Sequence, residues 1–189
     1  MEIIRLDRFI ANQTEYSRKE VKMLVKKGLV KVNGVVVSST DIKIDADKDD
    51  VNVNGESICY KKYIYIMLNK PAGYVCSTKD GESPTVLELI PDEIKNVHKG
   101  IFPAGRLDKD SEGFVFLTND GELSHRILSP KKHIPKYYIV KLNKPFEKSY
   151  VQQFAEGLVL KSGEQCLSAR VDGYENDNNY AFIELYEGK

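Results

Sequence analysis

The first sixty residues combine two short helical patterns with short β patterns. Hydrophobic residues at helical spacing form two stripes, the first made of Leu6, Phe9 and Ile10 and the second of Val21, Leu24 and Val25. Ser17 is a favourable N-cap for the second helix, which we expect from about residue 18 to residue 27, and Gly28 is a favourable stop. Asn33-Gly34, within VKVNGVVV, is the strongest short signal for a β-hairpin.

Beyond residue 60 the pattern favours strands over helices. YIYIMLNKPAGYVCST, residues 63–78, predicts a strand, a turn and a second strand. Further strands are expected at 113–118, 137–142, 169–174 and 180–186, and helices near 85–89, 122–128 and 149–156. Because short turns separate several of these strands, we predict an α+β fold with a mainly antiparallel sheet and flanking helices. We place a domain boundary near Cys59 to Lys62, which gives a small α/β domain at 1–60 and a larger domain at 61–189.

Composition narrows the class of protein. Lysine plus arginine equals aspartate plus glutamate at 28 each, so net charge gives no indication of a polyanionic partner. The N-terminus does not read as a signal peptide, and no apolar run approaches the ~20 residues that span a bilayer. Cys59, Cys76 and Cys166 are odd in number and widely spaced, which argues against a disulfide framework and a zinc site. We therefore expect a cytoplasmic protein without a membrane partner.

The charges are unevenly distributed. Residues 17–31 hold six basic residues and one acid, whereas residues 41–56 hold six acids and two lysines. A second basic segment, SHRILSPKKHIPKYY, lies in a stretch without acids between Leu123 and Phe146. A lysine-rich helix by itself is most often a solvated face. Two separate basic segments in a neutral chain are also consistent with a protein that holds RNA at two places.

The segment GRLDKDSEGFVFLTNDG, residues 105–121, brings three carboxylates together before an apolar strand. Such acids most often cap or solvate a turn. Asp108, Asp110, Glu112 and Gly113 also fit the first half of a calcium loop, but position twelve is Asn119 and a strand follows where that motif needs a helix. These residues therefore exclude an EF-hand calcium site and leave a turn with a purely structural role as the simplest interpretation.

The N-terminal pattern resembles the S4 RNA-binding module. Two short helices, the second of them basic, precede GLVKVNGVVV, and the similarity covers roughly residues 3–55. The resemblance implies that the following residues face RNA phosphates: Arg5, Arg8, Arg18, Lys19, Lys22 and Lys26.

The remainder resembles a pseudouridine synthase of the ribosomal RsuA type. Three segments carry this similarity, namely GRLDKDSEGFVFLTNDGELSHRILSP, YIMLNKPAGYVCST and KYYIVKL. The resemblance implies that Asp108 is the nucleophile, which leaves Asp110 and Glu112 as turn and surface acids. It also implies a reaction that needs no cofactor and no metal.

The same resemblance assigns the pocket and the RNA-contacting residues. Arg106 corresponds to the arginine thought to fill the space that the flipped base leaves, Tyr138 to the tyrosine that packs against uracil, and Leu107 lies between Arg106 and Asp108 in the pocket. Tyr137 should point to the opposite face of its strand. Further RNA contacts are expected from Lys70, His125, Arg126, Lys131, Lys132 and Lys136.

The resemblance implies that the substrate is one uridine of 16S rRNA, of the uridine 516 type. This RNA would be either naked or part of a small-subunit assembly intermediate. We expect the protein to be a monomer. Two alternatives stay open, a 23S rRNA synthase of the same family and a non-catalytic RNA-binding or assembly factor. One departure is that the family pattern continues past E-G-K/R into a Y-H-Q-x-K/R-R-M segment, whereas this sequence ends at YEGK. The resemblance therefore implies an incomplete pocket and little or no activity for these 189 residues alone.

Overall fold

The computed structural model describes residues 2–79, 81–97, 100–129, 132–175 and 177–187. The chain forms two compact units, Met1–Ser124 and His125–Lys189, and each is described by itself. All strand pairs between the described strands are antiparallel, which confirms the expected mainly antiparallel α+β fold. Within the described ranges, no helix is both long enough and apolar enough to cross a membrane.

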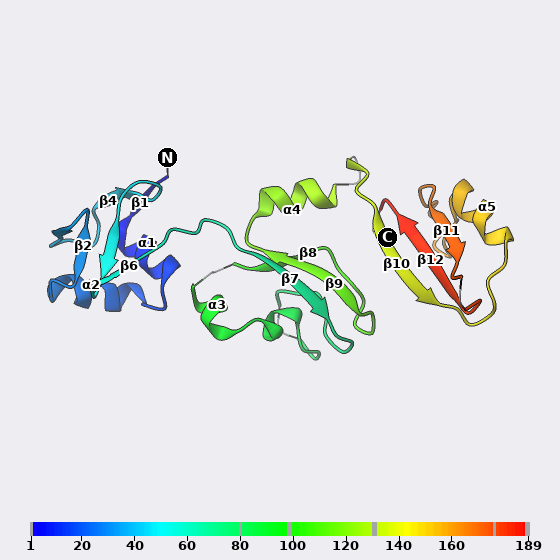
Figure 1. Ribbon diagram of the computed structural model, residues 1–189, viewed down its shortest axis with the longest axis horizontal. Coiled ribbons are helices and arrows are strands. Elements are labelled where there is room, and N and C mark those ends of the chain that lie inside the picture. The colour runs from blue at the N-terminus through cyan, green and yellow to red at the C-terminus, as the bar shows by residue number, and fades with distance from the viewer. Residues whose placement is uncertain (1, 80, 98–99, 130–131, 176, 188–189) are drawn as a thin grey trace. The chain divides into compact units, whose positions relative to one another are not determined.

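The first sixty residues fold into two helices and two small sheets (Figure 1). The helices are α1 (Leu6–Gln13) and α2 (Arg18–Lys26). β1 (Ile3–Arg5) pairs with β4 (Lys43–Asp45) in one sheet. The second sheet has the order β3-β2-β5-β6, with these bounds: β2 Val30–Val32, β3 Val35–Val36, β5 Val51–Val53 and β6 Glu56–Ser57.

Local hydrogen bonds and backbone conformation explain where α2 begins and where the first hairpin turns. The Ser17 hydroxyl accepts a hydrogen bond from the Glu20 amide at 3.3 Å, and the Ser17 amide donates to the Glu20 carboxylate at 2.7 Å, so the predicted N-cap is a full capping box. Asn33 and Gly34 have φ values of 50° and 79°, the left-handed pair that a tight hairpin requires. Both sequence predictions are confirmed.

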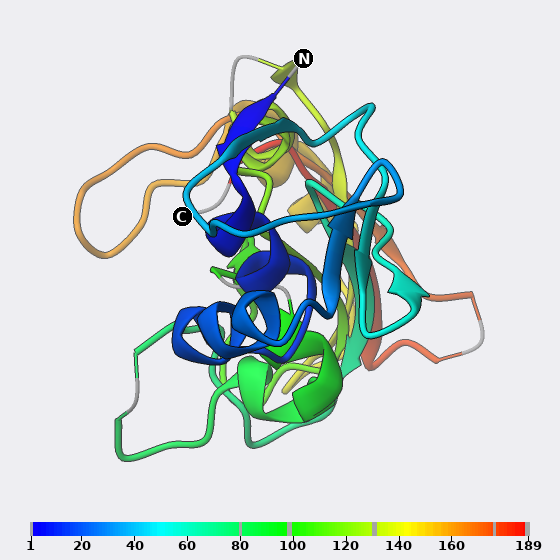
Figure 2. The same ribbon diagram turned by 90° about the vertical axis from the view of Figure 1, so that its left-hand side faces the viewer.

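The two predicted hydrophobic stripes meet in one core. Leu6, Phe9 and Ile10 from α1 lie against Val21 and Val25 from α2, and α1 and α2 lie next to each other as the blue helices of Figure 2. The sheet residues of this core are Val30, Ile44, Val51 and Val53. Burial of these side chains, rather than the propensity of two short helices, stabilises this part of the unit.

A three-stranded sheet follows, with the order β7-β9-β8. Its strands are β7 (Tyr65–Lys70), β8 (Phe102–Ala104) and β9 (Gly113–Thr118), and its covering elements include the 3₁₀ helix η1 (Val86–Leu89) and α3 (Asp92–Val97). Alternate residues of β7 and β9 face a second core built on Val86, Ile90, Ile101, Val115 and Leu117. The helix α4 (Gly121–Leu128) comes directly after β9 and crosses from the first unit into the second.

One predicted strand is wrong. Residues 74–78 were expected to form a second strand after the turn, but they form no strand, and the strand that pairs with β7 is β9, from Tyr65↔Thr118 to Lys70↔Gly113. Val75 makes only an isolated bridge to Thr85. The alternation at 74–78 instead reflects a segment whose Tyr74 and Cys76 pack on the core beside η1.

The second unit is a sheet of order β10-β12-β11 with α5 packed on β11 (Figure 1). Its elements are β10 Lys136–Lys141, α5 Ser149–Glu156, β11 Arg170–Gly173 and β12 Tyr180–Leu185. The four elements lie within a residue or two of the predicted ranges. The domain boundary at 60/61 stays a prediction.

Candidate functional site

The three carboxylates of the GRLD segment lie in the loop that joins β8 to β9. Gly105 and Gly113 end this loop with φ values of 104° and 120°, which side chains other than glycine rarely adopt. The two strands on either side are held in register from Phe102↔Thr118 to Ala104↔Phe116. A hairpin of two paired strands therefore presents the loop, and a glycine with positive φ lies at each end of the loop.

Asp108 begins a turn within this loop and presents its carboxylate to solvent. The Ser111 amide donates to the Asp108 carbonyl oxygen at 3.1 Å, which places Lys109 and Asp110 in the middle of the turn. Asp108, Asp110 and Glu112 are all exposed. The Asp108 carboxylate forms no hydrogen bond or ion pair with any described residue, so it is open to a ligand.

Lys70 lies beneath this turn and is completely buried. Its ammonium group donates to three backbone carbonyl oxygens, those of Pro71 at 3.0 Å, Lys109 at 3.0 Å and Ser111 at 2.5 Å. The expectation that Lys70 contacts RNA is not met in this arrangement, because none of its side chain reaches the surface. The sequence shows a lysine beside a proline, and only the fold reveals that two carbonyl oxygens of a loop 39 and 41 residues away accept hydrogen bonds from it.

Gly73 and Cys76 add two contacts to the same loop. The Gly73 amide donates to the Lys109 carbonyl oxygen at 2.8 Å, and the Leu107 amide donates to the Cys76 sulfur at 3.3 Å. Sequence reasoning gave neither residue a role at the loop. No local signal marks them, because the contacts join segments that are more than thirty residues apart.

Arg106 and Leu107 precede Asp108 and point into different surroundings. Arg106 is exposed and forms no ion pair with a described acid, so the structure does not support a purely structural salt bridge for it. Leu107 is half-buried and packs against the core that includes Val115 and Leu117. The side chain of Leu107 anchors the loop while its neighbours on either side stay exposed.

Tyr138 lies in β10, in the second unit, directly opposite Ile183 of β12. It is half-buried, whereas Tyr137 is exposed and stacks on Phe182 with ring centroids 5.6 Å apart. The two tyrosines therefore lie on opposite faces of the strand, as predicted. Tyr138 and Asp108 belong to different units.

The second basic segment surrounds the end of α4 and the start of β10. His125, Arg126 and Lys132 are exposed, and Lys136 is half-buried at the first position of β10. Lys131, which was also expected to contact RNA, lies outside the described residues. No three His, Cys, Asp or Glu side chains in the described ranges are grouped as metal ligands would be.

The basic residues expected to face RNA in the first sixty residues are all exposed, and one of them, Arg5, is paired with an acid. Arg8, Arg18, Lys19, Lys22 and Lys26 are all exposed on α1 and α2.

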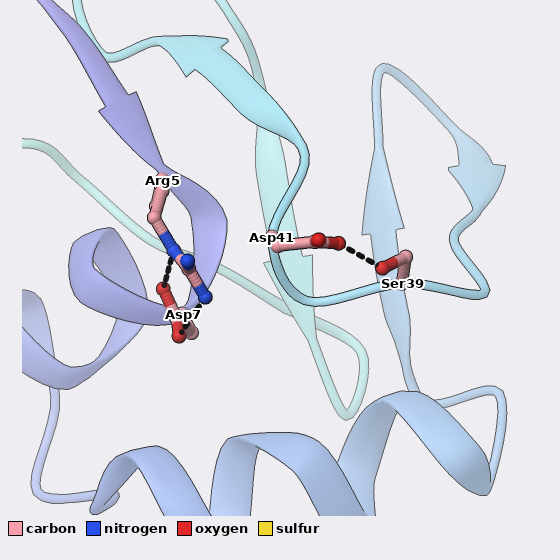
Figure 3. Close-up of polar contacts among 4 residues, drawn as sticks. All are labelled: Arg5, Asp7, Ser39 and Asp41. Atoms are coloured by element: carbon pink, nitrogen blue, oxygen red, sulfur yellow. Dashed lines mark hydrogen bonds and ion pairs between the residues drawn. The ribbon is translucent and has the colours of Figure 1, made fainter.

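Arg5 is exposed too, but its guanidinium is engaged by Asp7 (Figure 3). Arg5 Nε donates to Asp7 Oδ1 at 3.1 Å and Nη2 to Oδ2 at 2.9 Å. This pairing lowers the pKa of the Asp7 carboxyl below its ordinary value and raises that of Arg5. Asp41, which accepts a hydrogen bond from Ser39, lies close enough to act on the charge of Arg5 as well. Two acids thus offset the charge of Arg5 before any phosphate approaches.

Comparison with known families decides the class of protein. Residues 64–188 match the RNA pseudouridylate synthase family, and residues 4–57 match the S4 domain. The chain belongs to the RNA pseudouridine synthases. These are isomerases that act on RNA, and the resemblance to the RsuA type is confirmed by the relatives.

Several RNA pseudouridine synthases are similar over most of the chain. An uncharacterized RNA pseudouridine synthase of Bacillus subtilis, YtzG, is 40% identical over 98% of this chain and 78% of its own. The ribosomal small subunit pseudouridine synthase A of Vibrio parahaemolyticus is 36% identical over 98% of this chain and 78% of its own. That of Pasteurella multocida is 40% identical over 84% of this chain and 67% of its own. A crystal structure of a pseudouridylate synthase superposes with a TM-score of 0.61 at 34% identity, covering 98% of this chain and 78% of that one.

Proposed function

We propose that this synthase isomerises one uridine of 16S rRNA, of the uridine 516 type, and that Asp108 is its nucleophile. The observation that carries the assignment of Asp108 is its placement. Its carboxylate is exposed and unpaired among the described residues, and the backbone of its loop is hydrogen-bonded to Lys70 and Cys76. The small-subunit substrate is proposed from similarity to relatives that are named ribosomal small subunit pseudouridine synthase A.

The reaction exchanges one bond of the nucleoside for another. The bond between ribose C1′ and uracil N1 breaks, the base turns, and a bond from C1′ to C5 forms. The proton on C5 leaves and N1 gains one, so no atom is gained or lost and no redox cofactor is needed. Asp108 can attack C1′ to give a covalent ester, as carboxylates do in glycosidases, or remove the C2′ proton to give a glycal.

Access to the uridine requires base flipping. A stacked uridine must leave the helix at a cost of a few kcal/mol, which contacts in the pocket offset. Arg106, next to Leu107 and exposed, is proposed to fill the space that the base leaves, and Tyr138 to pack against the uracil. The absence of an ion pair on Arg106 among the described residues supports this role, since its guanidinium is available.

Two basic surfaces are proposed to hold the RNA. One is the exposed lysine and arginine set of α1 and α2, and the other is formed by His125, Arg126, Lys132 and Lys136. The partner is 16S rRNA, free or in an assembly intermediate, and the synthase is proposed to act as a monomer in the cytoplasm.

The test uses RNA labelled with tritium at C5 of uridine, because this proton is released to water only when C5 becomes bonded to C1′. The 189-residue chain and a chimera that continues with the remaining residues of the Bacillus subtilis relative are incubated with 16S RNA, 23S RNA and partly assembled small subunits. Asp108→Asn should abolish release, whereas Asp110→Asn, in the same turn, should retain it. Mapping by carbodiimide-blocked primer extension should show one stop in 16S RNA.

Other outcomes separate the alternatives. A stop in 23S RNA alone would indicate a large-subunit synthase of the same family. Tight binding of the RNAs without release from any of them would favour the non-catalytic assembly factor. Release that persists in Asp108→Asn would remove Asp108 from the chemistry.

A further inference from the structure

The segment 60–62 lies just beyond the S4 match, which ends at residue 57, and is hydrogen-bonded to α1. The Lys61 amide donates to Gln13 Oε1 at 2.9 Å, and Gln13 Nε2 donates to the Lys61 carbonyl oxygen at 3.2 Å. One side chain of α1 thus satisfies both main-chain hydrogen-bonding groups of Lys61, as a neighbouring strand would. The segment is therefore fixed at Lys61 although it belongs to no helix or strand.

Contacts at both ends of the segment hold it as well. The Tyr60 ring lies beside Phe9 of the first core, with ring centroids 5.7 Å apart. Burial and a hydrogen bond to Glu2 raise the pKa of Tyr60 to about 12, so its hydroxyl stays protonated. The Lys62 ammonium pairs with the Glu2 carboxylate at 3.1 Å. Because an exposed ion pair contributes little to stability, we infer that the Tyr60 ring and the Gln13 carboxamide supply most of the anchoring.

The next residue along the chain is held from a different place. The Ile64 amide donates to Asn119 Oδ1 at 3.0 Å, and the Ile64 carbonyl oxygen accepts from Thr118 Oγ1 at 2.7 Å. These partners lie at the end of β9 and directly after it. The segment 60–62, by contrast, is held by residues of the first sixty, so it belongs with the S4 module.

Three basic side chains line one cleft beside α1, namely Arg8, Arg18 and Lys61. All three are exposed, and none forms an ion pair with a described residue. The described lining holds one acid, Glu2, which is already paired with Lys62. The cleft therefore offers three positive charges to an anionic ligand.

The cleft is continuous with the basic surface of α2. Arg18, which lines the cleft, is the first residue of α2, and Lys19 and Lys22 are exposed on the same helix. Asp7 acts on the charge of Arg18, but Arg5 already engages its carboxylate. An extended row of cations suits a chain of phosphates better than a single small anion, and this favours an RNA backbone as the ligand.

We propose that the segment 60–62 is a third RNA-contacting element of the S4 module. In this arrangement Lys61 binds a phosphate of the RNA backbone, and Gln13 is a positioning residue that holds Lys61 at the cleft. The inference rests on the proposed function, in which the surface of α1 and α2 holds the RNA. It extends that surface past the end of the S4 match to residue 62.

The charge of Lys61 is tested by equilibrium binding of a 16S RNA transcript to the 189-residue chain at several salt concentrations. Lys61→Gln should lower the affinity about threefold or more and reduce the slope of log affinity against log salt by about 0.7–0.9. The fold should persist, because Gln13 binds the main chain of residue 61 and not its side chain. Lys48→Gln, at an exposed lysine in the acidic segment, is the matched control and should change neither quantity.

The role of Gln13 is tested by a double-mutant cycle. Gln13→Ala removes no charge, yet it should lower RNA affinity because Lys61 is no longer held at the cleft. In the Lys61→Gln background the same substitution should have no further effect, since Gln13 acts only through Lys61. A merely structural role would lower the affinity by the same factor in both backgrounds, and that result would overturn the assignment of Gln13.

A direct readout needs no variant. Bound 16S RNA should slow the acetylation of the Lys61 amine several-fold, as measured by mass spectrometry of the modified chain. The Lys48 amine should react at the same rate with and without RNA. Equal reactivity of Lys61 in the two conditions would overturn the proposal. If Gln13→Ala fails to fold by circular dichroism, this measurement and the Lys61→Gln titration decide the question.

The salt titrations also separate this inference from the proposed function. The triple replacement of Lys19, Lys22 and Lys26 by glutamine is measured beside Lys61→Gln. A reduced slope in the triple variant with an unchanged slope in Lys61→Gln would overturn the inference and leave the α2 surface in place. Unchanged slopes in both would overturn the inference together with the proposed S4 surface. Because turnover is not used, the outcome for Asp108 does not affect either result.

Discussion

Arg5 and Lys70 are both basic in the sequence, and both were assigned to RNA, yet their surroundings differ. Arg5 is exposed but paired with Asp7, and Lys70 is buried among carbonyl oxygens. A basic residue contributes to phosphate binding only if its charge is both accessible and not already offset. Neither condition can be judged from the residue type alone.

The pair of Arg5 and Asp7 predicts a pH dependence. Because the pKa of Asp7 is lowered in the folded chain, its contribution to stability is complete above the unfolded pKa and is lost as the pH falls through about 4 and below. Asp7→Asn should therefore lower the free energy of unfolding at neutral pH, and the difference from wild type should shrink on acidification. Urea titrations at several pH values measure this. Glu15→Gln, at an exposed glutamate in the same part of the chain, should show no such convergence.

At the scale of elements, α2 depends on its cap. The capping box of Ser17 and Glu20 supplies partners for amides that the helix itself leaves free. Ser17→Ala should cost about 1 kcal/mol in the free energy of unfolding, and Ser17→Asp, which keeps an acceptor, should cost less. Urea unfolding followed by far-UV circular dichroism checks the change. An unchanged free energy of unfolding in Ser17→Ala would mean that the cap contributes nothing to stability.

The β8–β9 hairpin shows that local sequence patterns can predict a strand without predicting the strands with which it pairs. The bounds of β9 were predicted correctly, because FVFLT is an apolar run rich in aromatic and β-branched residues that follows a turn. Its two partners were not predicted. β8 has only three residues, one of them proline, and the strand expected after β7, at 74–78, does not form. Strand pairing depends on which faces must be buried together, and this information is spread along the chain.

At the scale of the whole molecule, the uneven charge predicts salt-dependent RNA binding. Joint replacement of Lys19, Lys22 and Lys26 by glutamine should reduce the slope of log affinity against log salt by about 0.7–0.9 for each phosphate that the variant no longer neutralises. Arg5→Gln should change the slope little, because Asp7 already offsets its charge. Replacement of Lys43 and Lys48, which lie in the acidic segment, is the matched control. An unchanged slope in the triple variant would place α2 outside the RNA interface.

The sequence by itself determined the features that depend on neighbours in the chain. The cap at Ser17, the turn at Asn33-Gly34 and the strand of β9 follow from residues within a few positions, and the GRLD and S4 patterns were sufficient to indicate the family. Only the tertiary structure decided the pairing of β7 with β9, the burial of Lys70 and the contact between Cys76 and Leu107. These depend on segments far apart in sequence that meet only when the hydrophobic faces of the sheet and η1 are buried together.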